Sequence, residues 1–306
     1  MNKIKKIIYN VLRNYVKNYI TGNLGKVVED DEKLTCYINK EKIKKQNYHY
    51  TISLFGITEN NKRLADAYNL NKPICYIIDG ITFKKKNVYI FGYEGCEVII
   101  KNCNFEFGMS SFIHSGKCTL DNTYIRAFSN LSFQAKELAI QNMNSTQLKV
   151  LGSKKSISFT ANDKLYIINS TIGKEKTKVS LAATNELNVI NSKIIGNEIL
   201  CKSPNIRTDE NSSLTASDKV NLETDNFDTI NITTPTIILN DDEISNKKKS
   251  VTLKKITDSL ALKRLELIKI LRKLKNECEQ INSEKIKEYK SSLEGQSISK
   301  VLKNRY

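Results

Sequence analysis

The chain has 306 residues and a formal net charge of +16, with 49 Lys and Arg against 33 Asp and Glu. Its 12 Gly and 3 Pro exclude a collagen-like or linker-dominated chain. No apolar run approaches membrane-spanning length, and the seven Cys show no C-x-x-C spacing. We therefore expect no transmembrane segment, no metal and no cofactor. Unpaired Cys residues are typical of a reducing cytoplasm, which is the predicted location.

The first 20 residues predict a basic amphipathic helix. Its apolar residues recur at the helical period and share one face: Ile4, Ile7, Ile8, Val11, Leu12, Tyr15, Tyr19 and Ile20. The opposite face carries the candidate residues for binding an anionic membrane or another anionic partner: Lys3, Lys6, Arg13 and Lys17. Two interpretations stay open, an interfacial membrane anchor and a cap over the apolar end of a solenoid. The basic start lacks the apolar run of a signal peptide.

Residues 21–73 show no clear repeat and are interpreted as an N-terminal cap subdomain. Strands are expected at residues 34–38 and 50–55, and a short helix at residues 62–70. His49, which lies between two Tyr residues, is expected to have a structural role.

Residues 74–245 contain a repeated phrase that predicts a parallel β-helix. The phrase alternates apolar residues with others, reaches an Asn and is followed by another apolar residue, as in 98–105 and 165–172. The repeated Asn residues are Asn102, Asn122, Asn142, Asn169 and Asn191. A period of two indicates a strand with one buried face, and a second short strand precedes most phrases. Roughly eight such turns are enough to bury a continuous core.

The repeated Asn explains how the chain bends after each strand. Asn tolerates the left-handed backbone conformation, and its amide bonds to its own backbone or to the Asn of the next turn. These five residues are therefore expected to form a structural ladder. In an upstream copy of the phrase, Gly80 occupies the position of the Asn, and glycine also adopts the left-handed conformation readily. In a downstream copy, Thr224 occupies the same position. Thr is less suited to this turn than Asn or Gly, so the stack of turns is expected to end near Thr224.

These repeats resemble those of the right-handed parallel β-helix (pectin-lyase-like) superfamily, which also stacks Asn at the turn after a strand. The resemblance covers residues 74–240 and implies a mainly β fold. The expected fold class is a right-handed parallel β-helix with an N-terminal amphipathic helix and cap and a C-terminal α-helical module. No family catalytic motif is matched, so the resemblance implies no activity. The layout also distantly resembles bactofilin-type polymers, which have a β-helix core and membrane-targeting flanks.

No nucleotide-binding, metalloprotease or serine-hydrolase motif occurs, so no catalytic residue is assigned. His114 is expected at an outward position of a strand. Asp121, which lies between Lys101 and Arg126, is the best candidate for an acid or base. Two such charges on adjacent turns are normally a solvated surface.

Residues 246–306 predict a helical module after a basic linker. Apolar residues recur every seven positions at Leu253, Leu260, Leu267, Leu274 and Ile281. The companion heptad positions are only partly apolar, so the coiled-coil pattern is half present. The expected roles are packing on the solenoid, over an apolar outward stripe at Ile168 and Ile190, or contact with a second copy or a protein partner.

The basic residues gather at both ends of the chain, whereas the repeat region is nearly neutral. The leading hypothesis is a non-catalytic β-helix scaffold or interaction protein that assembles at the inner surface of the membrane. The alternative is a carbohydrate-active β-helix enzyme, such as a polysaccharide lyase or hydrolase, or a sugar-binding protein. A ladder of stacked carboxylates on one strand face would favour the enzyme. Nucleic acid is not expected as a partner, because no motif for it is present.

Overall fold

The computed structural model describes residues 3–84, 87–92, 95–106, 111–114, 116–128, 130–227, 229–245 and 250–253, together with Glu284 and Lys287. The chain divides into two units, residues 1–254 and residues 255–306. The predicted helical module at 246–306 lies outside the described residues, apart from the strand at 250–253 and those two single residues.

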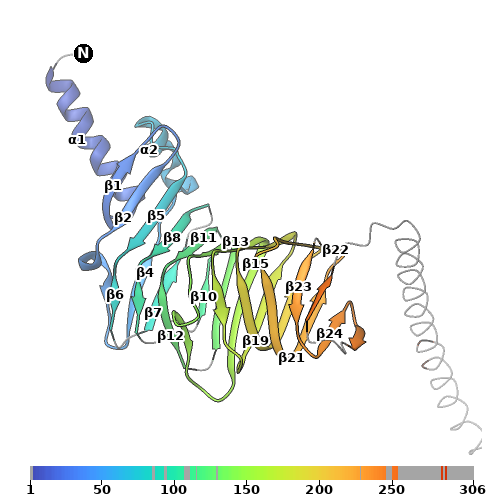
Figure 1. Ribbon diagram of the computed structural model, residues 1–306. Coiled ribbons are helices and arrows are strands. Elements are labelled where there is room, and N and C mark those ends of the chain that lie inside the picture. The colour runs from blue at the N-terminus through green and yellow to red at the C-terminus, as the bar shows by residue number, and fades with distance from the viewer. Residues whose placement is uncertain are drawn as a thin grey trace, which may run out of the picture. The chain divides into compact units, whose positions relative to one another are not determined.

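The first unit is a β-solenoid of about seven turns, in which successive parallel strands stack along one axis (Figure 1). Strands make up 56% of the chain, which confirms the mainly β prediction. Most turns contribute a strand to each of three faces. The turn count is close to the roughly eight that the repeats predicted.

The first face contains the strands of the Asn phrase. They are β2 (Leu34–Ile38), β5 (Ile74–Asp79), β8 (Glu97–Lys101), β11 (Lys117–Asp121), the second halves of β13 (Asn130–Gln141) and β15 (Lys155–Ile168), β18 (Glu186–Ile190), β20 (Asn205–Thr208) and β22 (Asn226–Phe227).

The second face follows the Asn turn and consists of two blocks of short strands. The first block is β6 (Thr82–Phe83), β9 (Asn104–Phe105), β12 (Tyr124–Ala127) and β14 (Leu148–Val150). The second block is β16 (Thr171–Gly173), the starts of β19 (Lys193–Lys202) and β21 (Ser213–Glu223), and β23 (Ile230–Thr233).

The third face is made of the strands that precede the Asn phrase. They are β4 (His49–Ser53), β7 (Asn87–Phe91), β10 (Ser111–Ile113), the first halves of β13 and β15, β17 (Thr177–Ala183), the ends of β19 and β21, and β24 (Thr236–Leu239). The downstream copy at 220–227 belongs partly here, because Val220 pairs with Ile199 and Ile237. Thr224 therefore does not continue the Asn ladder.

The interior consists of apolar ladders that run along the axis. Phe83 stacks on Phe105, with ring centroids 5.0 Å apart. Phe133 lies between the rings of Phe112 and Phe159, at 5.6 and 5.8 Å. In-register parallel pairing places like side chains above one another, as the repeat requires.

The five repeated Asn residues all take the left-handed conformation, with φ between 44° and 55°, and Gly80 does so at 65°. Their amides form only parts of a ladder. Asn122 donates to Asn102 at 2.8 Å, and Asn191 donates to Asn169 at 2.9 Å. Other amides in the row bond to carboxylates instead, since Asn142 donates to Asp121 at 2.7 Å.

A second, buried polar stack accompanies the Asn turns. The residue after each Asn points inward, and three consecutive turns carry Ser170, Ser192 and Ser212 there, each at most 4% exposed. The Ser170 N–H donates to Ser192 Oγ at 3.0 Å, and the Ser192 N–H donates to Ser212 Oγ at 3.1 Å. The hydroxyls thus satisfy backbone donors that the sharp turn would leave unpaired.

Both ends of the solenoid finish with antiparallel strands. At the N-terminal end, β1 (Gly25–Glu29) pairs with β2, and β3 (Lys44–Lys45) pairs with β4. At the C-terminal end, β25 (Asp242–Ser245) pairs with β24, and β26 (Ser250–Leu253) pairs with β23. The parallel stack is therefore not continued beyond either end within the described residues.

The N-terminal region is part of the same stack. β2 occupies the predicted range 34–38 and pairs in parallel with β5, while β4 pairs in parallel with β7. The predicted short helix is α2 (Glu59–Ala67), and a 3-10 turn η1 (Lys40–Lys42) follows β2. The helix α1 (Lys3–Ile20) precedes β1. Its C-terminal part lies beside β1 and α2, and its N-terminal part extends away from them (Figure 1).

Candidate functional site

The helix α1 contacts the rest of the unit through a mixed polar and apolar face. Val16 and Ile20 are buried at 3% and 0% exposure, and the Tyr9 ring lies 5.4 Å from that of Tyr68. The helix ends at Ile20, and the chain turns at Gly22, whose φ is 68° and where a Cβ would lie 2.2 Å from the Phe55 ring. Glycine is thus required both for the turn and for the close approach.

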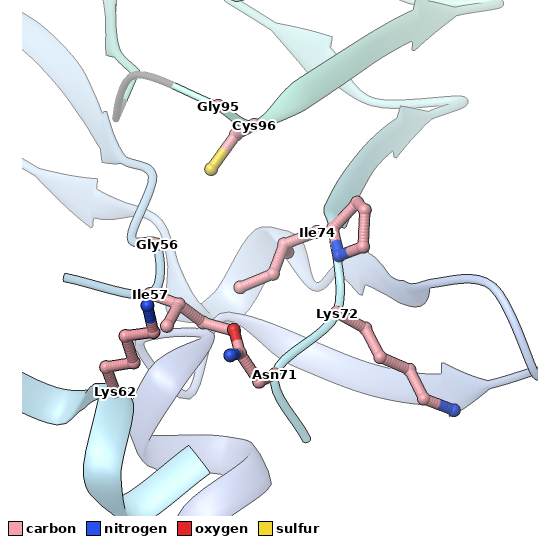
Figure 2. A pocket seen from close by; sticks show the side chains of 9 residues that line it. Gly56, Ile57, Lys62, Asn71, Lys72, Ile74, Gly95 and Cys96 are labelled. Carbon is pink, nitrogen blue, oxygen red and sulfur yellow. The ribbon is translucent and has the colours of Figure 1, made fainter. Parts of the chain in front are cut away.

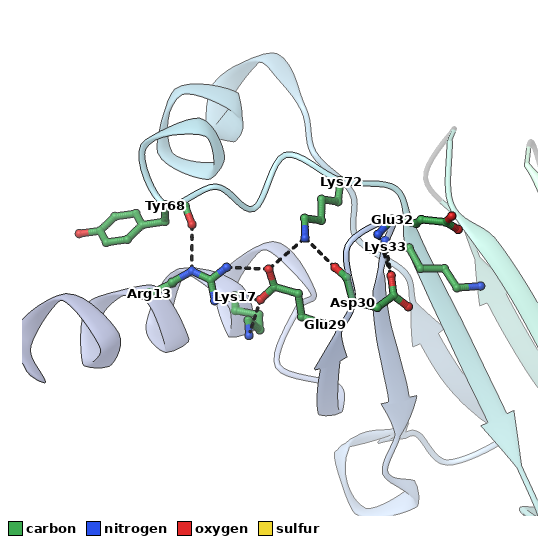
Figure 3. Close-up of polar contacts among 8 residues, drawn as sticks. All are labelled: Arg13, Lys17, Glu29, Asp30, Glu32, Lys33, Tyr68 and Lys72. Carbon is green, nitrogen blue, oxygen red and sulfur yellow. Dashed lines mark hydrogen bonds and ion pairs between the residues drawn. The ribbon is translucent and has the colours of Figure 1, made fainter. Parts of the chain in front are cut away.

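Glu29 on β1 is the centre of an ion-pair cluster that holds α1 (Figure 3). Arg13 donates to its two carboxylate oxygens at 2.8 and 2.6 Å, and Lys17 approaches it at 2.9 Å. Lys72 donates to Glu29 at 3.2 Å and to the Asp30 carbonyl at 2.6 Å. We call these four residues, Glu29, Arg13, Lys17 and Lys72, the Glu29 cluster.

The Glu29 cluster is partly buried, which strengthens its charge-assisted hydrogen bonds. The Glu29 side chain is 15% exposed. The Arg13 hydrogen bonds, followed by those from Lys17 and Lys72, lower the pKa of Glu29 to about 2. Arg13 also donates from Nε to the Tyr68 carbonyl at 3.0 Å, so its guanidinium joins α1 to the end of α2. The roll of α1 about its own axis is thereby fixed.

With that roll, most of the apolar residues of α1 face away from the rest of the unit, and Val16 and Ile20 face towards it. Seven of the eight residues that the sequence places on one face are between 45% and 70% exposed: Ile4, Ile7, Ile8, Val11, Leu12, Tyr15 and Tyr19. We call this set the apolar face of α1. Only Ile20 is buried. A helix that capped the solenoid with this face would bury these side chains, whereas here α1 docks through Val16 and Ile20 together with Arg13 and Lys17.

The four predicted anion-binding residues have different surroundings. Arg13 and Lys17 are held by Glu29. Lys6 and its neighbour Lys5 are exposed, and the side chain of Lys3 lies outside the described part of the chain. The binding role of this set stays a prediction. Glu29, which no sequence pattern marks, determines which of these side chains face solvent.

The outward side chains of the first face alternate in sign. Glu97, Lys117, Glu137, Lys164 and Glu186 occupy equivalent places on five successive turns. The Lys117–Glu137 pair is 2.9 Å apart. A second row reads Asp79, Lys101, Asp121, and Lys101 approaches Asp79 at 3.2 Å. Neither row is a ladder of stacked carboxylates, so the feature that would favour a polysaccharide-cleaving enzyme is not found in the described residues.

Asp121, the best acid or base candidate from the sequence, has a structural contact, since it accepts the hydrogen bond of Asn142. Ile168 and Ile190 are outward as predicted, and Ile190 is 41% exposed. The helix predicted to cover them lies outside the described residues.

The outward position predicted for His114 is wrong. The side chain is 2% exposed and lies on the same side of its strand as Phe112. Its Nε2 is 2.9 Å from the Cys96 carbonyl, and burial lowers its pKa. Two glycines leave the space for the ring, because a Cβ at Gly92 or Gly116 would lie 1.8 or 2.8 Å from a ring nitrogen.

A hollow of about 290 Å³ lies between α2 and the turn at Gly95 (Figure 2). The Cys96 thiol points into it and is 3.0 Å from the Phe55 carbonyl. Lys62 and Asn71 lie on the side of α2, and Lys72 is directed away from the space. The lining residues present no acid–base pair, so they define no reaction.

The described Cys residues are buried thiols: Cys36, Cys75, Cys96, Cys103, Cys118 and Cys201. Burial raises the pKa of Cys36 and Cys201 to about 12, which keeps them protonated and unreactive. Among the described residues, no three His, Cys, Asp or Glu side chains are arranged to hold a metal ion. No helix in the described ranges combines the length and apolar character needed to cross a bilayer.

Comparison with protein-family models, with curated proteins and with solved structures finds no match to this chain. The class that the fold defines is therefore a parallel β-solenoid. The pectin-lyase-like and bactofilin-type resemblances rest on the repeat pattern and the layout alone.

Proposed function

We propose that this protein is a non-catalytic β-solenoid scaffold that attaches to an anionic membrane surface through the apolar face of α1. The observation that carries the proposal is the exposure of seven large apolar side chains on one helix, next to Lys5 and Lys6. An interfacial helix buries such a face among the lipids, while Lys residues near it attract anionic headgroups.

The Glu29 cluster supports this proposal. An apolar face of this extent normally folds against its own protein, because exposure to water is unfavourable. Here Arg13 and Lys17 bind Glu29 instead and keep the apolar face directed outward. We infer that the helix is presented in the orientation in which it meets a membrane.

The ends of the solenoid support a discrete scaffold over an end-to-end polymer. Antiparallel strands at both ends, such as β1 and β25, do not offer the parallel edge that a further solenoid turn would extend. Oligomerisation or partner binding through the C-terminal segment remains part of the proposal. Buried thiols are in keeping with the cytoplasmic side of the membrane. We also propose right-handed winding, the usual hand of parallel crossovers.

Co-sedimentation with vesicles tests the proposal. The full chain is mixed with vesicles of phosphatidylcholine and phosphatidylglycerol, with vesicles of phosphatidylcholine alone, or with no lipid. We expect pelleting with the anionic vesicles only. The Ile7→Glu/Val11→Glu double variant should bind at least about tenfold more weakly, because one buried Ile contributes about 1.5–3 kcal/mol.

The control is Leu64→Glu, which adds one negative charge, half of the change in the double variant, at a 39%-exposed apolar position on α2. It should pellet like the unmodified chain. Equal pelleting of the double variant and of this control would contradict attachment through α1. So would a full chain that stays in the supernatant with every vesicle.

A further inference from the structure

A hollow of about 470 Å³ lies at the corner where the second face of the solenoid meets the third face. Its apolar lining includes Leu148 and Val150, which are buried at 3% and 8% exposure. Four lysines from three segments surround it: Lys149 on β14, Lys155 at the start of β15, and Lys174 and Lys176 on the turn between β16 and β17. We call this site, with these four lysines, the lysine hollow.

The lysine hollow lies where the second face is interrupted. β14 pairs with β12, and β16 pairs with β19, but the described strands show no pairing between β14 and β16. Lys155 pairs in register with Thr177. The turn that carries Lys174 and Lys176 therefore lies next to the loop that joins β14 to β15, and three basic segments are brought together.

The turn between β16 and β17 holds its two lysines on a defined backbone. It follows Gly173, whose φ is 82° and where a Cβ would lie 2.2 Å from the Ile195 carbonyl oxygen, so only glycine fits there. The Thr177 N–H donates to the Lys174 carbonyl at 2.8 Å, which closes the turn. The Ser217 hydroxyl donates to the Glu175 carbonyl at 3.4 Å.

The lysines of the hollow lack the acidic partners that other outward lysines of the solenoid have. Lys117, Lys178 and Lys202 each lie 2.8–2.9 Å from a Glu carboxylate. No carboxylate of the described residues forms an ion pair with any lysine of the hollow, and Glu175 is the one acidic residue that lines it. Four lysines against one Glu leave a net charge of +3 in the lining, and such a cluster attracts anions.

Two further cations extend this positive charge, but only locally. Lys154 is exposed in the loop between β14 and β15, and Arg126 on β12 pairs in register with Lys149. Along the axis, acidic residues limit the basic region in both directions: Glu106 one turn before Arg126, and Glu198 and Asp218 on the two turns after the Lys174 turn.

This confinement and the residue type select the class of ligand. A nucleic acid or a membrane surface spreads its phosphates over many turns, where Glu106 and Asp218 would repel them. Carboxylates are matched best by the planar fork of Arg, whereas the cations that line the hollow are all Lys. The Lys ammonium acts as a point charge that suits phosphate oxygens. A compact ligand with several phosphates meets all three conditions.

We propose that the lysine hollow binds a chain of two or more linked phosphate groups, as free polyphosphate or as the phosphate tail of a nucleotide. Lys149 and Lys155 contact the phosphate oxygens from one side, and Lys174 and Lys176 contact them from the other. Linked phosphates place several negative charges close together, which matches four cations around one hollow. The site includes no residue of α1 and is independent of membrane attachment.

Calorimetric titration of the full chain tests the proposal, in about 0.15 M salt and without divalent metal ions. The probes are tripolyphosphate and ATP, with citrate, hexaglutamate and a dT oligonucleotide as other anions. We expect tripolyphosphate or ATP to bind at least about tenfold more tightly than the other three. Tighter binding of ATP would identify a nucleotide tail as the source, and equal or tighter binding of tripolyphosphate would identify a free chain.

The Lys174→Gln/Lys176→Gln variant should lose at least about tenfold in affinity for the tighter probe, because two charge-assisted hydrogen bonds are removed. The matched control is Lys40→Gln/Lys42→Gln. Residues 40–42 have the same Lys-Glu-Lys sequence but lie on η1, outside the hollow. The control should keep its affinity. Circular dichroism and the melting temperature establish that each variant is folded.

Glu175→Gln should change the affinity in the opposite direction. It removes the acidic residue of the lining and should tighten polyphosphate binding by about two- to fivefold, the effect of one exposed charge. A damaged fold would not produce tighter binding. Glu41→Gln, the equivalent change on η1, should leave the affinity unchanged.

Three outcomes would overturn the proposal: no binding of tripolyphosphate or ATP at millimolar concentration, binding of another anion as tightly as theirs, or the same affinity in both lysine double variants. Pelleting of Lys174→Gln/Lys176→Gln with anionic vesicles should equal that of the unmodified chain, because α1 is intact. The two proposals therefore fail separately.

Discussion

Arg13 on α1 and Glu29 on β1 form a two-pronged ion pair, in which the guanidinium nitrogens lie 2.8 and 2.6 Å from the two carboxylate oxygens. This ion pair helps to determine which side of the amphipathic helix α1 faces the protein and which side faces solvent. Because the charged side of α1 docks, its apolar face is exposed, the reverse of the usual arrangement at a protein surface.

Replacing Glu29 by Gln should destabilise the first unit and loosen α1. The substitution keeps the volume but leaves Arg13, Lys17 and Lys72 close together without a counter-charge. We expect a loss of about 2–3 kcal/mol, since a partly buried, bidentate pair is broken on one side. Thermal unfolding followed by circular dichroism measures this. Glu32→Gln, at an exposed carboxylate nearby, is the control and should change little.

The same carboxylate predicts an acid transition. The pKa of Glu29 is lowered from an ordinary 4.5 to about 2. A depressed pKa in the folded state contributes stability that is present above about pH 4.5 and lost as the pH falls towards 2. The shift corresponds to up to about 3 kcal/mol. Melting temperatures measured between pH 6 and pH 2.5 should fall less for Glu29→Gln than for the unmodified chain, and parallel curves would disprove the assignment.

Asn191 should be replaceable by Gly at lower cost than by Ala. Its φ of 46° suits Gly, whereas Ala would be strained there, by about 1–2 kcal/mol. Both variants lose the hydrogen bond to Asn169. In urea unfolding, Asn191→Ala should therefore have the lower midpoint of the two. An Ala variant that equals or exceeds the Gly variant would show that the left-handed turn does not limit stability.

Ser192→Ala should destabilise the solenoid although it removes only one oxygen atom. The Ser192 hydroxyl accepts the Ser170 N–H at 3.0 Å in a fully buried turn. Without it the donor has no partner, which costs about 1–3 kcal/mol. Ser180→Ala, at an outward position of β17, provides a comparison that should stay within about 0.5 kcal/mol in the same unfolding assay.

The repeat pattern predicted the solenoid because local chemistry determines it. Alternation specifies the buried side of each strand, and Asn at 102, 122 and 191 marks the left-handed turn. The strand at 34–38 followed from the same rule. The buried Ser stack was not predicted, although Ser170 and Ser192 directly follow the repeated Asn, because the repeated phrase specifies no residue type at that position.

The features of the candidate site depend on tertiary contacts and could not be predicted in this way. The pairing of Arg13 with Glu29 follows from how α1 folds back on β1, so the helical pattern alone left both anchor and cap open. His114 was assigned an outward position by alternation, but its ring lies on the buried side of the strand with Phe112. Its burial depends on space left by Gly92, which lies a full turn away in the sequence.

The most direct test of the central claim uses the fact that the chain contains no Trp. Tyr15→Trp places a single fluorophore on the apolar face of α1, and Tyr37→Trp places one on the first face of the solenoid. With phosphatidylglycerol-containing vesicles, the account predicts a blue shift of the Tyr15→Trp emission and quenching by brominated lipid, with no change for Tyr37→Trp. An unshifted and unquenched Tyr15→Trp emission at saturating lipid would contradict membrane attachment through α1.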